Sequence, residues 1–249
     1  KIKISQSNIN TIKFISKYNN DFDNATRVIH KIINEMKTIA RTSFPIDIVV
    51  NKNILSPSGL GGVSSNIASI IFSINQLWNI GLSQQQLRDF SMNFGSDISF
   101  FFSKEAALVT GRGELLESLP VKILCPVIVM PMANITPQSN KTKTMYSKII
   151  QKDMTDGART QTFIKNISNT NSLNNYCFNV FESVIERHYP EQFYLMKKIE
   201  HIIGIQVHLS GSGPAIYTIP DQSHTTENIR KKLMDNSIES FVVSCLQES

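Results

Sequence analysis

The chain has 249 residues, of which 41% are apolar and 18% charged. We find no signal-peptide pattern at its start and no apolar run long enough to span a bilayer, which excludes a helical membrane protein. Lys and Arg number 25 against 20 for Asp and Glu, a net charge of +5. The basic residues are scattered, so we expect an anionic small ligand and neither nucleic acid nor membrane as partner.

The three cysteines, Cys125, Cys177 and Cys245, are widely spaced and form no Cys-x-x-Cys pair. This pattern predicts reduced thiols in a cytoplasmic protein, each of them a small buried hydrophobe more often than a nucleophile. The chain begins at Lys1 and not at Met, so we expect a fragment or a processed product.

Strands and helices are predicted in turn along the first part of the chain. Residues 1–5 alternate between polar and apolar, as a half-buried strand does. From Asn24, a residue type common at helix N-caps, apolar residues recur at helical spacing as far as Met36. Residues 46–50 predict a second strand, and a loop rich in Gly and Ser follows over 56–63.

Two further helices are predicted after this loop. The first covers 64–80 and ends at Gly81, where a left-handed residue would close it. Ser83 and Gln86 form a capping-box pattern that opens the second helix. A turn at 111–114 then predicts a β-hairpin.

The pattern restarts near Pro120, where we place a domain boundary, giving an α+β protein with domains 1–118 and 119–249. In the second domain, the residue pattern predicts a strand at 127–130 and helices near 142–151, 160–168 and 175–188. Another helix starts at Pro190 and stops at Gly204. The final elements are predicted as a strand at 205–209, a loop at 210–214, a strand at 215–219, a helix at 224–235 and a strand at 238–243.

The Gly-rich loop carries the clearest chemical signal. Gly59, Gly61 and Gly62 lack Cβ atoms, so backbone N–H groups can converge, and Ser64 and Ser65 open a helix whose N-terminus is partially positive. Such an arrangement can cradle a phosphate, although a plain turn with a serine cap is the alternative. The loop is neither a Walker motif nor a dinucleotide-binding G-x-G-x-x-G.

Several motifs occur in an order that resembles the GHMP small-molecule kinases, over residues 24 to the C-terminus. They are LGGVSSN at 60–66, NQLW at 75–78, GLS at 81–83, GSDISFF at 95–101, GRGE at 111–114, NVFE at 179–182, YPE at 189–191 and LSGSGP at 209–214. The resemblance implies a two-domain fold, with an N-terminal ribosomal protein S5 domain 2-like domain and a C-terminal ferredoxin-like α+β domain.

Within these kinases the chain is most similar to those acting on a cytidine diphosphate-linked methylerythritol in non-mevalonate isoprenoid synthesis. The resemblance implies ATP-dependent phosphorylation of the 2-hydroxyl of that substrate, with Mg²⁺ bridging the ATP phosphates. It assigns phosphate binding to Pro57, Ser58, Gly59, Leu60, Gly61, Gly62, Val63, Ser64, Ser65 and Asn66.

Asp97 matches the catalytic Asp of the family, which takes the proton of the acceptor hydroxyl; a helix N-cap is the alternative. Thr142 and Tyr146 match residues near the substrate's cytosine, although an exposed Thr and a half-buried Tyr fit them equally. Asn24 and Lys52 match positions near the ATP nucleoside, with a helix cap and a solvated lysine as alternatives. The resemblance places three more residues over the substrate, Gly211, Ser212 and Gly213, which are otherwise a tight turn.

The chain also departs from the family pattern. Val63, Pro57 and Ser58 stand where glycine is usual. The family's first strand, with a lysine in an Ala-Lys-Ile-Asn motif, and a Gly-Tyr-His segment have no counterpart here, so we expect N-terminal strands to be missing and residues 1–5 to be a later strand. The alternatives are therefore an inactive nucleotide-binding fragment or remnant, or another GHMP kinase.

Overall fold

The computed structural model describes residues 1–16, 22–41, 43–54, 58–103, 106–119, 127–131, 141–169 and 171–244. The chain divides into two compact units. Unit 1 comprises Lys1–Ser56 and Gly61–Pro120, and unit 2 comprises Pro57–Leu60 and Val121–Ser249. The Gly-rich loop is thus shared between the units, and the division at residue 118 remains a prediction.

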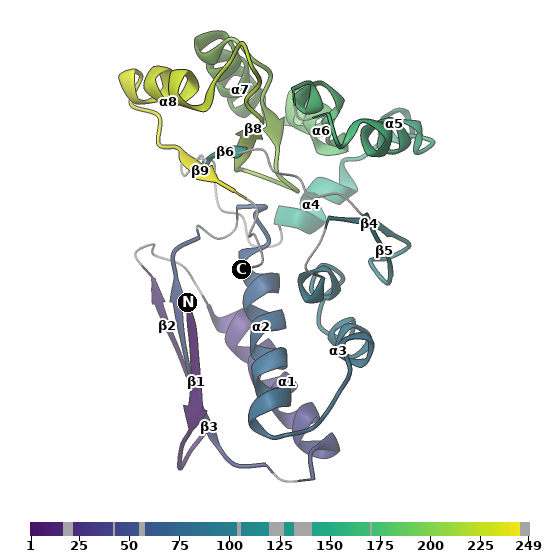
Figure 1. Cartoon of the computed structure of the whole chain (residues 1–249), viewed down its shortest axis with the longest axis vertical. Helices are drawn as coiled ribbons and strands as arrows, with labels where there is room; N and C mark the ends of the chain where they lie inside the picture. Colours follow the sequence, from purple (N-terminus) through teal and green to yellow (C-terminus); the bar gives the residue numbers. More distant parts are fainter. Residues whose placement is uncertain are drawn as a thin grey trace. The chain divides into compact units, whose positions relative to one another are not determined.

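Unit 1 is built on a sheet with the strand order β1 (Ile2–Gln6), β3 (Ile46–Lys52), β2 (Thr11–Ser16). β1 runs antiparallel to β3, whereas β2 runs parallel to β3 and is connected to it through helix α1 (Asp23–Ile39). Helices α1 and α2 (Gly62–Leu77) lie against this sheet (Figure 1). Alternate β3 residues and one stripe of each helix face inward and form the core between them, which is rich in isoleucine.

Four shorter elements complete the described part of unit 1. Helix α3 (Gln84–Ser91) begins with the predicted capping box, in which the Ser83 and Gln86 side chains bond each other's backbone N–H groups. The 3-10 helix η1 (Ser99–Phe102) follows. β4 (Ala107–Thr110) and β5 (Leu115–Ser118) form the predicted hairpin.

Two helix boundaries in unit 1 differ from the prediction. α1 has Phe22 at its N-cap, so Asn24 lies inside the first turn and is not the cap. α2 ends at Leu77 and not near residue 80, because Asn75 hydrogen-bonds both the N–H and the C=O of Leu82 and folds the chain back. The first left-handed residue after α2 is Asn79, with φ of 50°. Gly81 is left-handed too, with φ of 82°, but lies too far beyond Leu77 to be the C′ residue of α2.

Strand β2 was not predicted, although its sequence contains a sufficient signal. Thr11–Ser16 alternates, and Ile12 and Phe14 pack against the unit 1 core. The polar, Asn-rich composition around this segment conceals the alternation.

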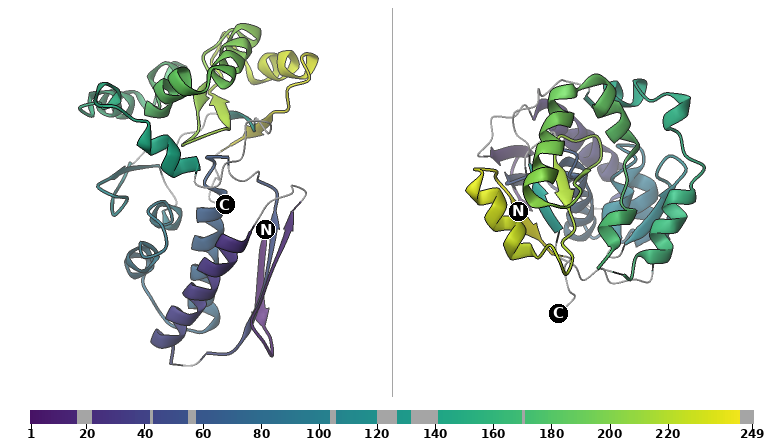
Figure 2. Two further views of the ribbon diagram at one scale, coloured as in Figure 1. Left: turned by 180° about the vertical axis from the view of Figure 1, so that it is seen from behind. Right: turned by 90° about the horizontal axis from the view of Figure 1, so that it is seen from above.

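Unit 2 has a four-stranded antiparallel sheet with the order β7 (His208–Leu209), β8 (Ile216–Thr218), β6 (Val127–Met130), β9 (Phe241–Val243). Figure 2 shows its helices from two further directions. They are α4 (Lys141–Ser147), η2 (Gln151–Asp153), α5 (Ala158–Asn166), η3 (Leu173–Tyr176), α6 (Val180–His188), α7 (Pro190–Ile203) and α8 (Thr226–Asp235). The strand order and the helical crossovers are those of a ferredoxin-like βαββαβ unit, so the predicted α+β fold is confirmed.

Several boundaries in unit 2 are corrected. The helix expected over 175–188 starts at Val180, because the Asn179 side chain accepts a hydrogen bond from Phe181 N and caps α6. The helix expected near 142–151 ends at Ser147, and the strand expected over 205–209 shortens to β7. Pro190 at the first position of α7 and left-handed Gly204 at its end are confirmed. No helix in the described parts of the chain is both long and apolar enough to cross a membrane.

Candidate active site

The N-terminus of α2 is open to an anion. Gly61, in the left-handed conformation with φ of 66°, is its N-cap, and within the described residues no side chain caps the helix. The first helical hydrogen bond runs from Ser65 N to Gly61 O, so the amides of the preceding helical residues have no partner within the helix. Helix α2 has no acidic residue in its first turn. Its N–H groups without helical partners and its helix dipole therefore favour a phosphate.

Close packing leaves little room for a Cβ at two positions beside this terminus. A Cβ on Gly61 would lie 2.6 Å from the Phe101 ring, and one on Gly62 would lie 3.1 Å from Lys52 Nζ. Phe101 belongs to η1, so the segment that carries Asp97 packs under the Gly-rich loop within unit 1. Val63, where the family has glycine, also packs against the unit 1 core.

Lys52 at the end of β3 is buried, with 3% of its surface exposed, so the alternative of a solvated lysine is wrong. Its Nζ has no hydrogen-bond partner among the described groups. Burial lowers the pKa of the Lys52 ammonium from its ordinary value. A buried amine without a partner beside a helix N-terminus is suited to an anion that the protein itself does not supply.

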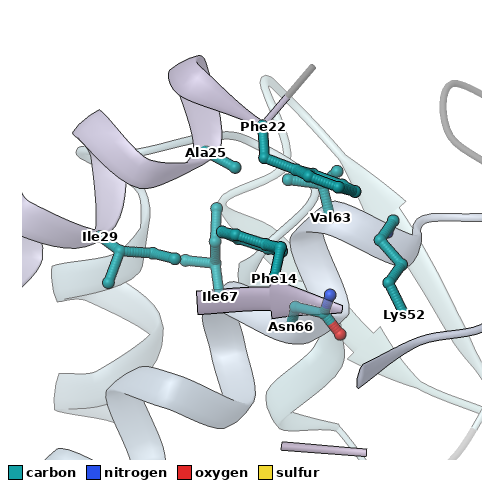
Figure 3. A pocket seen from close by; sticks show the side chains of 8 residues that line it. All are labelled: Phe14, Phe22, Ala25, Ile29, Lys52, Val63, Asn66 and Ile67. Carbon is teal, nitrogen blue, oxygen red and sulfur yellow. The ribbon is translucent and has the colours of Figure 1, made fainter. Parts of the chain in front are cut away.

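Lys52 lines a small pocket with aromatic side chains (Figure 3). Phe14 and Phe22 stack with ring centroids 4.5 Å apart and an interplanar angle of 7°. The enclosed volume is about 10 Å³, roughly one water, so a bound base requires side-chain movement. The other lining residues are Ala25, Ile29, Val63, Asn66 and Ile67.

Neither aromatic residue of this pocket was predicted as part of a site. Phe14 lies on the strand that was not predicted. Asn24 is exposed and one residue away from Ala25, and it does not line the pocket. Its role near a nucleoside stays a prediction.

Asp97 lies exposed on a turn that its neighbours hold in place. Ile98 is buried in the unit 1 core, and Ser99 Oγ lies 2.9 Å from Gly113 O and 3.2 Å from Ser96 O. Gly113 approaches so closely that a Cβ on it would lie 2.7 Å from Ser96 O. Asp97 does not cap η1, whose N-cap is Ile98, so the helix-cap alternative is wrong. A carboxylate on a fixed turn, without a structural hydrogen bond among the described residues, can act as a base.

The first residues of the Gly-rich loop pack within unit 2. Ala215 N donates to Ser58 O at 3.0 Å, and Ser210 Oγ donates to Gly59 O at 3.0 Å. The Ser58 hydroxyl accepts from Leu60 N. The loop over 210–214 therefore lies directly on Ser58 and Gly59, while Pro57 falls outside the described residues.

Three of the predicted substrate-side residues lie close together in unit 2. The hydroxyl oxygens of Thr142 and Ser212 are 3.2 Å apart. Tyr146 is 61% exposed, and its ring packs edge-on against Phe181 with centroids 5.0 Å apart. This surface offers two hydroxyls and an accessible aromatic ring, which suits a polar ligand that carries a base.

Comparison with known proteins identifies the fold and the class of enzyme. The model of the GHMP kinases N terminal domain matches residues 24–105. Residues 24–105 thus carry a GHMP kinase N-terminal domain. A 4-diphosphocytidyl-2-C-methyl-D-erythritol kinase of Dehalococcoides mccartyi is 28% identical over 207 residues, covering 81% of this chain and 70% of the relative. A kinase of the same name from Prochlorococcus marinus is 32% identical, covering 77% of this chain and 63% of the relative.

Solved structures show the same fold. A 4-(cytidine 5'-diphospho)-2C-methyl-D-erythritol kinase superimposes with a TM-score of 0.74 at 18% identity, covering 97% of this chain and 84% of that one. Phosphomevalonate kinase of Streptococcus pneumoniae superimposes with a TM-score of 0.72 at 12% identity, covering 98% and 88%. The domain match and the names of the curated relatives make the chain a small-molecule kinase that uses ATP. The uncapped N-terminus of α2 and the unpartnered Lys52 amine fit a nucleotide that carries phosphates.

Replacing Lys52 by Met is expected to raise the free energy of unfolding by about 1–2 kcal/mol at neutral pH, because a buried amine without a partner is removed. The folded-state pKa of Lys52 lies below its unfolded-state value. Between the two values the unfolded chain binds more protons, so the wild type gains stability as the pH rises and the difference between the proteins shrinks. Urea unfolding from pH 7 to 10 measures this.

The same variant tests whether Lys52 contacts the nucleotide. Loss of one charge-assisted contact is expected to weaken ATP binding by about tenfold. Lys13→Met, which changes an exposed lysine on neighbouring β2, is the control and should alter stability by less than about 0.5 kcal/mol. Equal effects of both substitutions would contradict a special environment at Lys52.

Proposed function

We propose that this GHMP kinase transfers the γ-phosphoryl group of ATP to the 2-hydroxyl of 4-diphosphocytidyl-2-C-methyl-D-erythritol. The observation that carries the proposal is the uncapped N-terminus of α2 next to the unpartnered amine of Lys52. The choice of acceptor is supported by the names of the relatives, which share about 28% of their residues over most of the chain.

Each group in this proposal has a distinct task. The α2 amides, with Gly61 and Gly62, hold the ATP phosphates, and Lys52 offsets their negative charge from inside unit 1. Asp97 accepts the proton of the attacking hydroxyl. Phosphoryl transfer mainly requires positioning and charge neutralisation, so this small set suffices.

The site also suits Mg²⁺ bound through the nucleotide. No group of three or more His, Cys, Asp and Glu side chains in the described parts of the chain could hold a metal by itself. Mg²⁺ commonly binds through substrate phosphates, water and one or two carboxylates. When bound, it would neutralise negative charge on the phosphates.

The decisive experiment offers the purified chain ATP, Mg²⁺ and one acceptor at a time. The acceptors are the cytidine-linked methylerythritol, homoserine, mevalonate, phosphomevalonate and galactose, followed by ³¹P NMR of the products. We expect a new phosphomonoester only with the first acceptor. Turnover of another acceptor would assign the chain to another GHMP kinase. ATP binding without any turnover would instead indicate an inactive nucleotide-binding protein.

A change at Tyr146 tests the substrate side. Tyr146→Ala is expected to raise KM for the cytidine-linked substrate by about tenfold or more, because base stacking on an aromatic ring contributes about 1–3 kcal/mol. Tyr194→Ala removes another exposed tyrosine of unit 2, 71% exposed on α7, and serves as the matched control. An unchanged KM in Tyr146→Ala would exclude stacking on this ring.

A further inference from the structure

The N-terminus of α6 binds the edge of strand β7 that faces away from β8. Asn179 Oδ1 accepts the capping bond from Phe181 N, while its Nδ2 donates to Leu209 O at 2.9 Å and to Gly211 O at 2.8 Å. Both amide donors of Asn179 and its acceptor oxygen are therefore used. Capping alone would need only an oxygen, which Ser, Thr or Asp supplies equally well.

Glu182, one turn further along α6, completes this contact. Its Oε1 accepts from Leu209 N at 2.9 Å, and His208 Nδ1, fully buried, lies 3.5 Å from the same oxygen. β7 pairs on its other side with β8 and is the last strand of its sheet. Two side chains of α6 thus satisfy the backbone groups of Leu209 that a neighbouring strand would otherwise bind.

The held segment continues directly into the loop that packs on the Gly-rich sequence. Ser210 Oγ donates to Gly59 O, and a Cβ on Gly211 would lie 3.0 Å from that same oxygen. Gly213 N donates back to Ser210 O at 2.8 Å, which fixes the turn. A shift of the Leu209–Gly211 backbone would therefore move Gly59 as well.

We propose that Asn179 is a positioning residue for phosphoryl transfer, which sets the backbone of the 210–214 loop and, through it, of Ser58 and Gly59. This inference rests on the proposed function of these two segments, since it assigns them a common support on α6. Asn179 contacts neither substrate in this proposal. It acts on kcat through the placement of other groups, and misplacement by about 1 Å can cost about 100-fold in rate.

The test compares Asn179→Asp, Asn179→Ser and Thr225→Ala. Asp and Ser keep a capping oxygen but lose the NH₂ group, and Asp also directs a carboxylate toward two carbonyl oxygens. Thr225 caps α8 of the same unit through Asn228 N, and among the described residues it makes no hydrogen bond to the 210–214 loop. The Thr225→Ala variant therefore measures the effect on activity of losing a helix cap alone.

We expect kcat to fall by about 10- to 100-fold in Asn179→Asp and less in Asn179→Ser. KM for ATP should change by less than about threefold, because the pocket around Lys52 belongs to unit 1. Amide hydrogen exchange of Ser210, Gly213 and Ala215 should become faster, with α7 and α8 unchanged. Thr225→Ala should keep wild-type kcat.

Wild-type kcat in Asn179→Asp, or lost activity with unchanged exchange in the loop, would overturn the proposal. An equal loss of kcat in Thr225→Ala would show that Asn179 acts only as a helix cap, and this result too would overturn the proposal. If the wild type phosphorylates no cytidine-linked substrate, the proposed function fails. In that case faster exchange of the loop amides in Asn179→Asp still supports the positioning, and unchanged exchange rejects it.

Discussion

Asp97→Asn is expected to lower kcat by about 1000-fold, within the range that general bases contribute. The amide keeps the shape of the carboxylate but cannot take the proton of the acceptor hydroxyl at neutral pH. The turn should not change, because Ile98 and Ser99 fix it from inside unit 1 and the Asp97 side chain is exposed. The unfolding free energy should therefore stay within about 0.5 kcal/mol of the wild type.

Steady-state kinetics with the cytidine-linked substrate, together with ATP affinity by calorimetry, measures this effect. ATP affinity should change little, because the proposed phosphate contacts are those of α2 and Lys52 and do not include Asp97. Asp89→Asn is the matched control, since Asp89 is also exposed in unit 1 and accepts a bond from Gln85 that an amide oxygen can keep. A variant that retains more than about a tenth of wild-type kcat would exclude Asp97 as the base.

Gly59→Ala is expected to lower the free energy of unfolding by about 3 kcal/mol or more and to remove most activity. Gly59 is left-handed, with φ of 79°, and a Cβ there would lie 1.9 Å from Ser210 O and 2.9 Å from Gly213 N. Both neighbours are backbone atoms of the loop that Asn179 holds, so neither can move away without breaking other bonds. The clash adds to the cost of the left-handed conformation, about 1–2 kcal/mol.

Gly157→Ala separates these two causes. Gly157 has nearly the same φ, 83°, but a Cβ there meets nothing within 4 Å. The Gly157→Ala variant should therefore lose only the unfolding free energy that the left-handed conformation costs, and it should keep wild-type kcat. Urea unfolding of both variants measures the difference, and equal losses would show that the approach of Gly59 to Ser210 is not rigid.

Much of the fold could be predicted from local sequence. The capping box at Ser83 and Gln86, Pro190 at the start of α7 and Gly204 at its end were all predicted and are confirmed. Boundaries failed where a distant or side-chain contact decided them. Phe22 stacks on Phe14 at the start of α1, and Asn75 turns the chain back after α2. Neither contact leaves a periodic trace in the sequence.

The candidate site divides in the same way. Motif order alone indicated the Gly-rich loop, Asp97 and the substrate-side residues, because these short segments carry their own chemistry. Their joint role in catalysis stays a prediction. The meaning of Lys52 could not be predicted, since a lysine at the end of a strand is normally solvated, and only the packing of α2 and the Phe14–Phe22 pair buries its amine.

The sequence by itself determined most of the succession of elements, strand β2 excepted, as well as the kinase motifs and an excess of positive charge, because helical period, capping and glycine conformation act over a few residues. Only the tertiary structure decided which glycines cannot be replaced and which polar groups lack partners. Gly59 and Ser210 are 151 positions apart, yet they meet through a hydrogen bond and a backbone approach that excludes a Cβ. Such contacts depend on the packing of whole elements, and local preference does not encode them.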